Sequence, residues 1–433
     1  MSEKMNIFWF RRDLRLNDNC GLFEALIAGQ KVLPIFIFDQ EILSKLPKDD
    51  ARVSFIHQEL ENIHHQLKKI GSSLTVCVGK PKDIFNSLSE KHQIETVFCN
   101  HDYEPYAIQR DLEIKELLRS KNINFKTFKD QVIFERNEIT KKDGTPYKVY
   151  TPYSKKWLES FEYQGIHFFP SEDHLTMCTE ENTDQFPTLE EIGFKKSSIK
   201  VASYTATSEL IDTYEATRNY PAKNSTSKLG THLRFGTVSV RKMVDKASKS
   251  NNITFLKELI WREFFMQILW HFPQTIKKSF KPKYDRILWI NNENDFDTWC
   301  KGKTGYPLVD AGMRELNTTG FMHNRVRMLV GSFLCKHLLI DWRWGEAYFA
   351  EKLHDYEQSS NIGNWQWVAG CGVDAAPYFR IFNPTTQIQK FDKDLDYIKK
   401  WVPEFQELTY PSPIVEHKFA RERCLKTYKE ALQ

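Results

Sequence analysis

The chain has 433 residues, of which 41% are hydrophobic and 27% charged, and its formal net charge is +4. This length exceeds one ordinary hydrophobic core, so two or three domains of a soluble globular protein are expected. The small net charge excludes a uniformly basic nucleic-acid binder, so any such surface must come from local clusters of Lys and Arg.

Localisation and redox state follow from what the sequence lacks. No apolar run approaches membrane-spanning length, and the first residues lack the apolar stretch of a secretory signal, so a cytoplasmic protein without membrane contact is expected. The eight cysteines are scattered without CxxC or metal-like spacing. They are interpreted as reduced thiols, and no metal site is predicted.

Short apolar runs alternate with helical patterns in the first third of the chain. Strands are predicted at residues 6–10, 32–38, 74–78, 96–100 and 125–128, and residues 53–70 and 107–121 carry apolar side chains at helical spacing. This alternation predicts a doubly wound parallel α/β sheet, although no GxGxxG motif supports dinucleotide binding. We therefore predict a Rossmann-like α/β domain at 1–130, a connector at 131–204 and an all-α domain at 205–433.

Three helical segments of the second half carry candidate site residues. Ser225, Thr226 and Ser227 precede an apolar-periodic run, where hydroxyl groups cap a helix and leave N–H groups for a phosphate; spacing alone favours a plain cap. Glu258 and Trp261 share one helix face, and a carboxylate buried beside Trp needs a solvated cleft or a hydrogen-bonding ligand. Residues 324 and 328 likewise lie one turn apart.

Residues 355–392 (DYEQSSNIGNWQWVAGCGVDAAPYFRIFNPTTQIQKFD) mix aromatic rings with many polar side chains. Buried polar groups need hydrogen-bond partners. The stretch therefore indicates either an enclosed site for a large planar polar ligand or a polar-aromatic junction between helices. The residues alone leave both interpretations open.

The blocks WFRRDLRLNDN, TSKL, NWQW, DAAPYFRIFNP and KFD resemble the photolyase/cryptochrome family over nearly the whole chain. The chain is most similar to class I cyclobutane pyrimidine dimer photolyases. The resemblance implies an antenna domain followed by a helical domain that binds FAD non-covalently in its reduced form. It also implies light-driven repair, in which an electron splits a dimer flipped out of UV-damaged DNA. A monomer is expected.

The resemblance also assigns roles to single residues. The cofactor would be held by Tyr214, Thr226, Ser227, Lys228, Leu229, Gly230, Phe255, Glu258, Arg262, Asn324, Arg327, Asp355, Tyr356, Glu357 and Asn361. The dimer would contact Glu258, Trp261, Arg262, Asn324, Arg325, Met328 and Trp367. Electrons would pass through Trp289, Trp342 and Trp365, and the catalytic set would be Glu258, Asn324, Met328 and Asn361. For Trp344 a surface role is favoured over a further branch of this relay.

Several positions depart from the family pattern or separate its members. Gly230 stands where Ser is usual, and Glu357 where Asp is typical. Tyr106 and Ala107 replace the Asn-Glu pair of folate-binding members, so a second antenna chromophore is expected without an identity. A segment usual between the WVPE and YPSPIV blocks is missing.

Two rival functions remain within the family. In (6-4) photolyases both positions 324 and 328 carry His, because that lesion needs proton transfer; Asn324 and Met328 cannot supply it. A cryptochrome, a blue-light receptor without repair activity, is the alternative function. The presence of Asn361 and the absence of a disordered signalling tail argue against it.

Overall fold

The computed structural model describes residues 4–179 and 186–433, which pack into two compact units. The first unit comprises the described residues of 1–135, 159–204 and 229–249, and the second comprises 136–158, 205–228 and 250–433. This grouping differs from the three predicted segments, because the expected connector is divided between the units and residues 229–249 pack with the first. Residues 180–185 of that connector lie outside the described residues.

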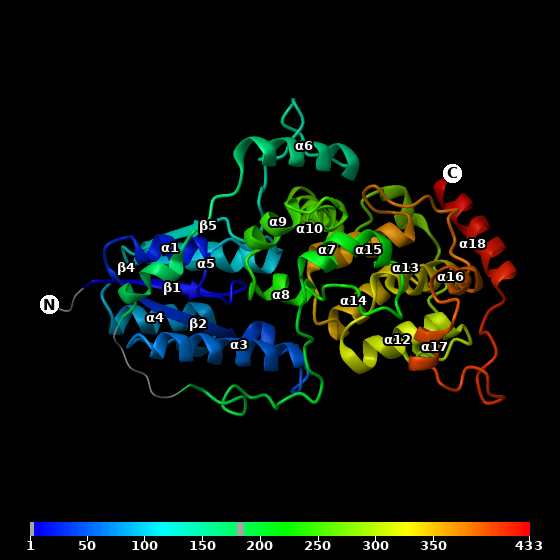
Figure 1. Cartoon of the computed structure of the whole chain (residues 1–433), viewed down its shortest axis with the longest axis horizontal. Helices are drawn as coiled ribbons and strands as arrows, with labels where there is room; N and C mark the ends of the chain where they lie inside the picture. The colour runs from blue at the N-terminus through cyan, green and yellow to red at the C-terminus, as the bar shows by residue number, and fades with distance from the viewer. Residues whose placement is uncertain (1–3, 180–185) are drawn as a thin grey trace. The chain divides into compact units, whose positions relative to one another are not determined.

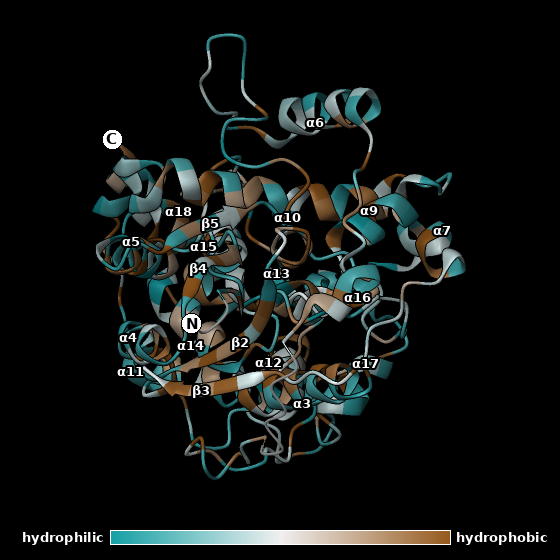
Figure 2. Cartoon of the chain, turned by 90° about the vertical axis from the view of Figure 1, so that its left-hand side faces the viewer, coloured by the Kyte–Doolittle hydropathy of each residue, from teal (hydrophilic) through white to brown (hydrophobic). Residues whose placement is uncertain are grey.

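A five-stranded parallel sheet forms the centre of the first unit (Figure 1). Its spatial order is β3-β2-β1-β4-β5, with β1 (Met5–Phe10), β2 (Lys31–Asp39), β3 (Thr75–Gly79), β4 (Ile94–Asn100) and β5 (Asn124–Phe128). Figure 2 colours β2 mostly as hydrophobic, and all of its residues after Lys31 are buried, as expected of a strand covered on both faces. The predicted doubly wound sheet and its five strands are confirmed.

Helices cover both faces of this sheet. Alternate residues of β1 enter different cores, Phe8 and Phe10 on one side and Ile7 and Trp9 on the other, because successive strand side chains point to opposite faces. The first core also takes apolar side chains from α1 (Cys20–Leu26) and α3 (Ala51–Lys68), and the second from α4 (Pro81–Lys91) and α5 (Pro105–Ser120). The remaining elements of this unit are α2 (Gln40–Leu43), the 3-10 turn η1 (Ser171–Met177), α8 (Gly230–Phe235) and α9 (Val240–Ser248).

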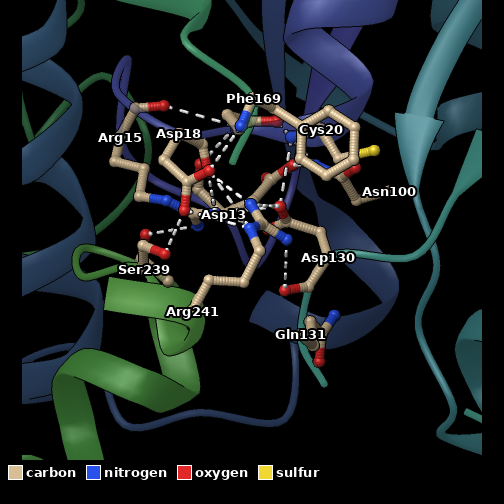
Figure 3. A network of polar contacts seen from close by, with 12 residues as sticks. Asp13, Arg15, Asp18, Cys20, Asn100, Asp130, Gln131, Phe169, Ser239 and Arg241 are labelled. Carbon is tan, nitrogen blue, oxygen red and sulfur yellow. Dashed lines mark hydrogen bonds and ion pairs between the residues drawn. The ribbon is translucent and has the colours of Figure 1, made fainter. Parts of the chain in front are cut away.

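A buried ion network ties α9 to loops at the sheet (Figure 3). Arg241 pairs with Asp18 at 3.0 Å and with Asp130 at 2.8 Å, and Arg15 pairs with Asp130 at 2.8 Å. Burial disfavours the carboxylate form of Asp130, but the two guanidinium groups outweigh burial and lower its pKa to about 2. Because a buried charge is costly without its partner, this network explains why residues 229–249 belong to the first unit.

The second unit is helical, as predicted, and its core surrounds α10 (Thr254–His271) and α15 (Gln358–Ala369). α15 packs against α10, α13 and α14, so residues far apart in sequence meet around it. The other helices are α7 (Ser208–Thr217), α11 (Glu293–Cys300), α12 (Pro307–Thr319), α13 (Asn324–Ser332), α14 (Trp342–Lys352), α16 (Pro384–Phe391), α17 (Asp396–Trp401) and α18 (His417–Leu432). Shorter turns are η2 (Pro273–Ile276), η3 (Pro282–Arg286) and the π-turn η4 (Phe333–His337).

α6 (Tyr150–Gln164) begins in the second unit and ends in the first. Within the described ranges, no helix combines the length and the apolar character needed to cross a membrane.

Candidate active site

A pocket that opens to solvent lies among α13, α14 and α15 of the second unit, and we call it the cavity. The cavity brings together eight predicted site residues, Asn324, Arg327, Met328, Asp355, Tyr356, Glu357, Asn361 and Trp365. Its other lining residues are Gly331, Phe349, Leu353, Ser360, Asn364 and Val368.

The start of α13 forms one wall of this cavity. Asn324, Arg327 and Met328 recur at helical spacing and line the cavity from one helix face, as expected. The helix is capped by His323, whose Nδ1 accepts a hydrogen bond from the backbone N–H of Arg325 at 3.2 Å. Burial, reinforced by the charges of Arg327 and Arg325, lowers the pKa of His323 to about 4, so its ring is neutral at neutral pH. Sequence reasoning missed this residue because His is not a usual cap.

Asn361 on α15 is held at the cavity wall by Glu346 on α14. Its Nδ2 donates to the backbone oxygen of Glu346 at 3.1 Å and to the carboxylate Oε1 at 3.0 Å. Burial raises the pKa of Glu346, while hydrogen bonds from Asn361 and Tyr356 oppose the rise. Since both N–H groups of the amide are used in this way, its carbonyl oxygen is the group left for a ligand. No local pattern pointed to Glu346, because only helix packing brings it to Asn361.

Two ion pairs hold charged residues at the cavity. Arg327 binds Asp355 through two hydrogen bonds of 3.1 and 2.9 Å. Arg262 on α10 pairs with Glu357 at 2.8 Å. The longer side chain of Glu357 thus finds a partner, and each buried charge is matched by an opposite one.

Glu258 and Trp261 share a face of α10, as predicted, but neither lines the cavity. Glu258 pairs with Arg218, and burial raises the pKa of Glu258 while this arginine opposes the rise. The Trp261 ring lies flat on Tyr150, with ring centroids 3.6 Å apart and an interplanar angle of 8°. Sequence reasoning missed Arg218 and Tyr150, because both come from segments outside the predicted motif.

A group of three arginines accompanies these residues. After burial, the charges of Arg218 and Arg380 are the causes that lower the pKa of Arg325. Arg380 also lies over the ring of Trp367 at 5.9 Å. Trp367 does not line the cavity, whereas Trp365 does, because residues two apart on a helix point in different directions.

The segment predicted to bind a phosphate differs from expectation. α8 begins at Gly230 after Leu229 and has no side-chain cap, so the prediction of a hydroxyl cap at residues 225–227 is wrong. Instead Ser225 donates to the backbone oxygen of Thr217 at 3.3 Å, and the backbone oxygen of Ser227 accepts from Thr205 at 2.8 Å. The chain folds back on residues 205–217 here, and these local bonds replace the cap.

The predicted phosphate residues are divided between the units. Thr226, Ser227 and Lys228 belong to the second unit, whereas Leu229 and Gly230 belong to the first. Tyr214 and Phe255, also predicted to contact the cofactor, meet edge to face in the second unit with centroids 5.2 Å apart. Burial and the charge of Glu258 raise the pKa of Tyr214 to about 12.

The three relay tryptophans lie in one region without touching. Trp342 and Trp365 are buried in the core of the second unit, and Trp289 packs against it. Trp289 meets Tyr428 at 6.0 Å, and Trp365 meets the fully buried Trp299 at 6.2 Å, each edge to face. Across the described chain, no ring contact joins the three predicted members. Trp299 is a ring that sequence reasoning passed over.

The residues of the cavity fit a planar aromatic group with polar edges. The rings of Phe349, Tyr356 and Trp365 supply apolar walls, while the Asn361 oxygen and the Arg327–Asp355 pair supply an acceptor and matched charges. A planar ring system with N–H groups at its edge is the kind of ligand that such walls and acceptors hold.

Comparison with known proteins agrees with a cavity that binds a planar aromatic cofactor. Residues 255–409 match the model of the FAD binding domain of DNA photolyase, and residues 6–173 match DNA photolyase. The chain is 37% identical to the deoxyribodipyrimidine photo-lyase of Agrobacterium fabrum, over 98% of this chain and 97% of that protein. It is 33% identical to that of Escherichia coli, over 98% of each chain.

Comparison with solved structures indicates the same family. A bacterial class III photolyase from Agrobacterium tumefaciens has a TM-score of 0.88 and 34% identity, over 100% of this chain and 98% of that one. An archaeal photolyase from Sulfolobus tokodaii, solved with two FAD molecules, has a TM-score of 0.84 and 35% identity, over 99% of this chain and 100% of that one. Because class III is represented here, the class I assignment stays a prediction.

Proposed function

The chain belongs to the DNA photolyase family, and from this premise we propose how its own residues perform light-driven repair of cyclobutane pyrimidine dimers in DNA. The observation that carries the proposal is the cavity that Asn324 and Met328 line together with Asn361, whose amide is held in one orientation by Glu346. Neither Asn324 nor Met328 can donate a proton near neutral pH, which suits a reaction driven by an electron and not by acid catalysis.

FAD is the cofactor, and the cavity would hold its ring system. When bound and reduced, FAD supplies the electron that opens the cyclobutane ring after excitation by blue light. The contacts that we propose for it are made by Arg262, Asn324, Arg327, Asp355, Tyr356, Glu357 and Asn361 at the cavity, and by Tyr214, Thr226, Ser227, Lys228, Leu229, Gly230, Phe255 and Glu258 elsewhere. Asn361 orients an acceptor toward the ligand, and the Arg327–Asp355 pair keeps a balanced charge beside it.

The lesion would lie beside α10 and α15, the helices that carry Trp261 and Trp367. Trp261 and Trp367 contribute apolar surfaces, which are worth about 1–3 kcal/mol per stacked base. Glu258, Arg262, Asn324, Arg325 and Met328 complete this set. The observed stack of Trp261 on Tyr150 supports a fixed indole that does not need to be ordered when the dimer enters.

Electrons would reach the cavity from the protein surface through Trp289, Trp342 and Trp365. The support for this relay is the burial of Trp342 and Trp365 and the position of Trp365 in the cavity wall. Trp344 is half-buried and contacts Phe296, which in turn stacks on Trp299. This arrangement supports Trp344 as a side branch.

One experiment separates repair from signalling. Protein carrying reduced FAD is mixed with an oligonucleotide that contains a cyclobutane thymine dimer and is illuminated with blue light. We expect light-dependent loss of dimers, read as recovery of pyrimidine absorbance, with none in the dark and none for an oligonucleotide containing a (6-4) lesion. A protein that binds FAD and the oligonucleotide but leaves the dimer intact would be a photoreceptor, and the proposal would be wrong. We further infer that the protein is a cytoplasmic monomer, which sedimentation and fractionation test.

A further inference from the structure

A hairpin at residues 136–149 of the second unit has no role in the reaction described above. Thr140 and Pro146 form an antiparallel bridge, and the backbone N–H of Lys141 donates to the Thr145 oxygen at 2.9 Å. The Asp143 side chain closes the turn by accepting from the Thr145 N–H at 3.0 Å and from its hydroxyl at 2.7 Å. In both views the loop stands beside α6, and Figure 2 colours it mostly as hydrophilic (Figures 1 and 2). The hairpin therefore has a defined shape of its own.

Both ends of this hairpin are anchored to α10 and the residue that follows it. At the first end, the Arg136 guanidinium lies 4.6 Å from the centroid of the Trp270 ring. At the second end, Lys148 lies over Phe272 at 5.3 Å, and Tyr150 lies flat on Trp261. The Tyr150 hydroxyl also donates to the backbone oxygen of Lys257 at 2.7 Å. The hairpin is thus fixed next to the helix that carries the proposed lesion wall.

The hairpin presents cations that the fold itself does not use in ion pairs. Lys141, Lys142 and Lys148 are exposed. Among the ion pairs of the described residues, none of the three takes part, and the nearest carboxylate in sequence, Asp143, is engaged in the turn. Lysines on a rigid turn beside a nucleic-acid site act as point charges for phosphate groups.

We propose that this hairpin is a backbone clamp, in which Lys141, Lys142 and Lys148 bind phosphates of the DNA on the Trp261 side of the dimer. The proposal rests on the proposed function, because it takes Trp261 as part of the lesion wall. Phosphate contacts of this kind fix the register of a protein on DNA but carry no sequence or damage information. The clamp therefore adds affinity for damaged and undamaged DNA alike, and damage recognition stays with the cavity.

The test compares two triple variants of equal charge. Lys141→Ala/Lys142→Ala/Lys148→Ala removes the clamp, and Lys418→Ala/Lys426→Ala/Lys429→Ala on α18 removes three exposed lysines elsewhere in the same unit. Affinity for a duplex with one thymine dimer and for its undamaged counterpart is measured by fluorescence anisotropy across about 50–200 mM salt. Unchanged melting temperatures show that both variants are folded.

Three lost phosphate contacts would reduce the slope of log affinity against log salt by about 2.7. The variant would therefore lose most affinity at low salt. Between 50 and 200 mM salt, a fourfold increase, the ratio of wild-type to variant affinity would fall by about 40-fold for both duplexes, because 4 raised to 2.7 is about 40. The α18 variant should keep the wild-type slope. A wild-type slope in the hairpin variant, an equal drop in the α18 variant, or a drop for damaged DNA alone would overturn the clamp.

The two proposals fail differently in this experiment. If the wild-type protein binds and repairs the dimer but the hairpin variant behaves identically, only the clamp is wrong. If the wild-type protein binds both duplexes equally and repairs neither, the proposed function is wrong whatever the hairpin does. If it binds no DNA, both are refuted.

Discussion

Replacing Glu346 by Leu tests the most specific feature of the cavity, the orientation of Asn361. The Glu346 side chain accepts one of the two amide N–H bonds, at 3.0 Å, and the backbone accepts the other, at 3.1 Å. Without the carboxylate, an N–H group inside the wall loses its partner, at a cost of about 1–3 kcal/mol. The amide is then more stable with its N–H groups turned toward the cavity, so the cavity wall presents a hydrogen-bond donor in place of an acceptor.

The consequence is a change in the reduction potential of bound FAD. The reduced ring carries an N–H that the oxidised ring lacks, so an acceptor in the wall stabilises the reduced form. One hydrogen bond contributes about 0.5–1.5 kcal/mol, and a tenfold change in equilibrium corresponds to about 59 mV for one electron. Glu346→Leu should therefore lower the midpoint potential by about 20–65 mV.

Spectroelectrochemical titration of the FAD-loaded protein measures this shift. Glu346→Gln is the matched control, since its side-chain oxygen can still accept from Asn361, and it should retain most of the wild-type potential. An unchanged potential in the Leu variant would refute the reasoning. So would an equal drop in both variants, because the effect would then come from charge and not from the amide orientation.

Three further results are expected. Trp289→Phe should slow light-driven reduction of oxidised FAD, followed by absorbance, while repair by pre-reduced protein is retained; loss of both would remove Trp289 from the relay. Tyr150→Leu should weaken binding of the dimer by about 2- to 12-fold, since an aromatic pair contributes about 0.5–1.5 kcal/mol, whereas Tyr150→Phe should retain it; equal affinities would show that the stack does not support Trp261. Asp130 has a pKa of about 2 in the folded protein, below its value in the unfolded chain. Its contribution of about 2 kcal/mol to the free energy of unfolding is therefore present above pH 4 and lost as the pH falls to 2. Asp130→Asn should lower the free energy of unfolding, measured with denaturant, by about 3–5 kcal/mol at neutral pH. It should also reduce the loss of stability at acid pH. A variant whose stability falls with pH as in the wild type would show that Asp130 is not its cause.

The sheet and the shared helix faces could be predicted because they follow from local periodicity. β1 alternates between two cores, and α13 presents Asn324 and Met328 together, so patterns of two and about four residues were sufficient. The boundary of the first unit could not be predicted in this way. Arg241 belongs there because of ion pairs with residues more than a hundred positions earlier in the chain, and no local pattern encodes such a contact.

The partners of the site residues were missed for the same reason. Glu346, Arg218 and Tyr150 satisfy Asn361, Glu258 and Trp261, yet each lies on another segment and becomes a neighbour only through packing. The hydroxyl cap at residues 225–227 was predicted from the sequence immediately around it, but hydrogen bonds with residues 205 and 217 take its place. Sequence thus identified the groups that face a ligand more readily than those that hold them in place.

The pair of Arg218 and Glu258 shows why these supporting residues matter for the chemistry. A carboxylate in this position was expected to need a hydrogen-bond donor, and in the protein alone Arg218 fills that need. Burial raises the pKa of Glu258, and the charge and hydrogen bond of Arg218 oppose the rise. A pyrimidine N–H that binds Glu258 would then meet an acceptor that Arg218 already orients.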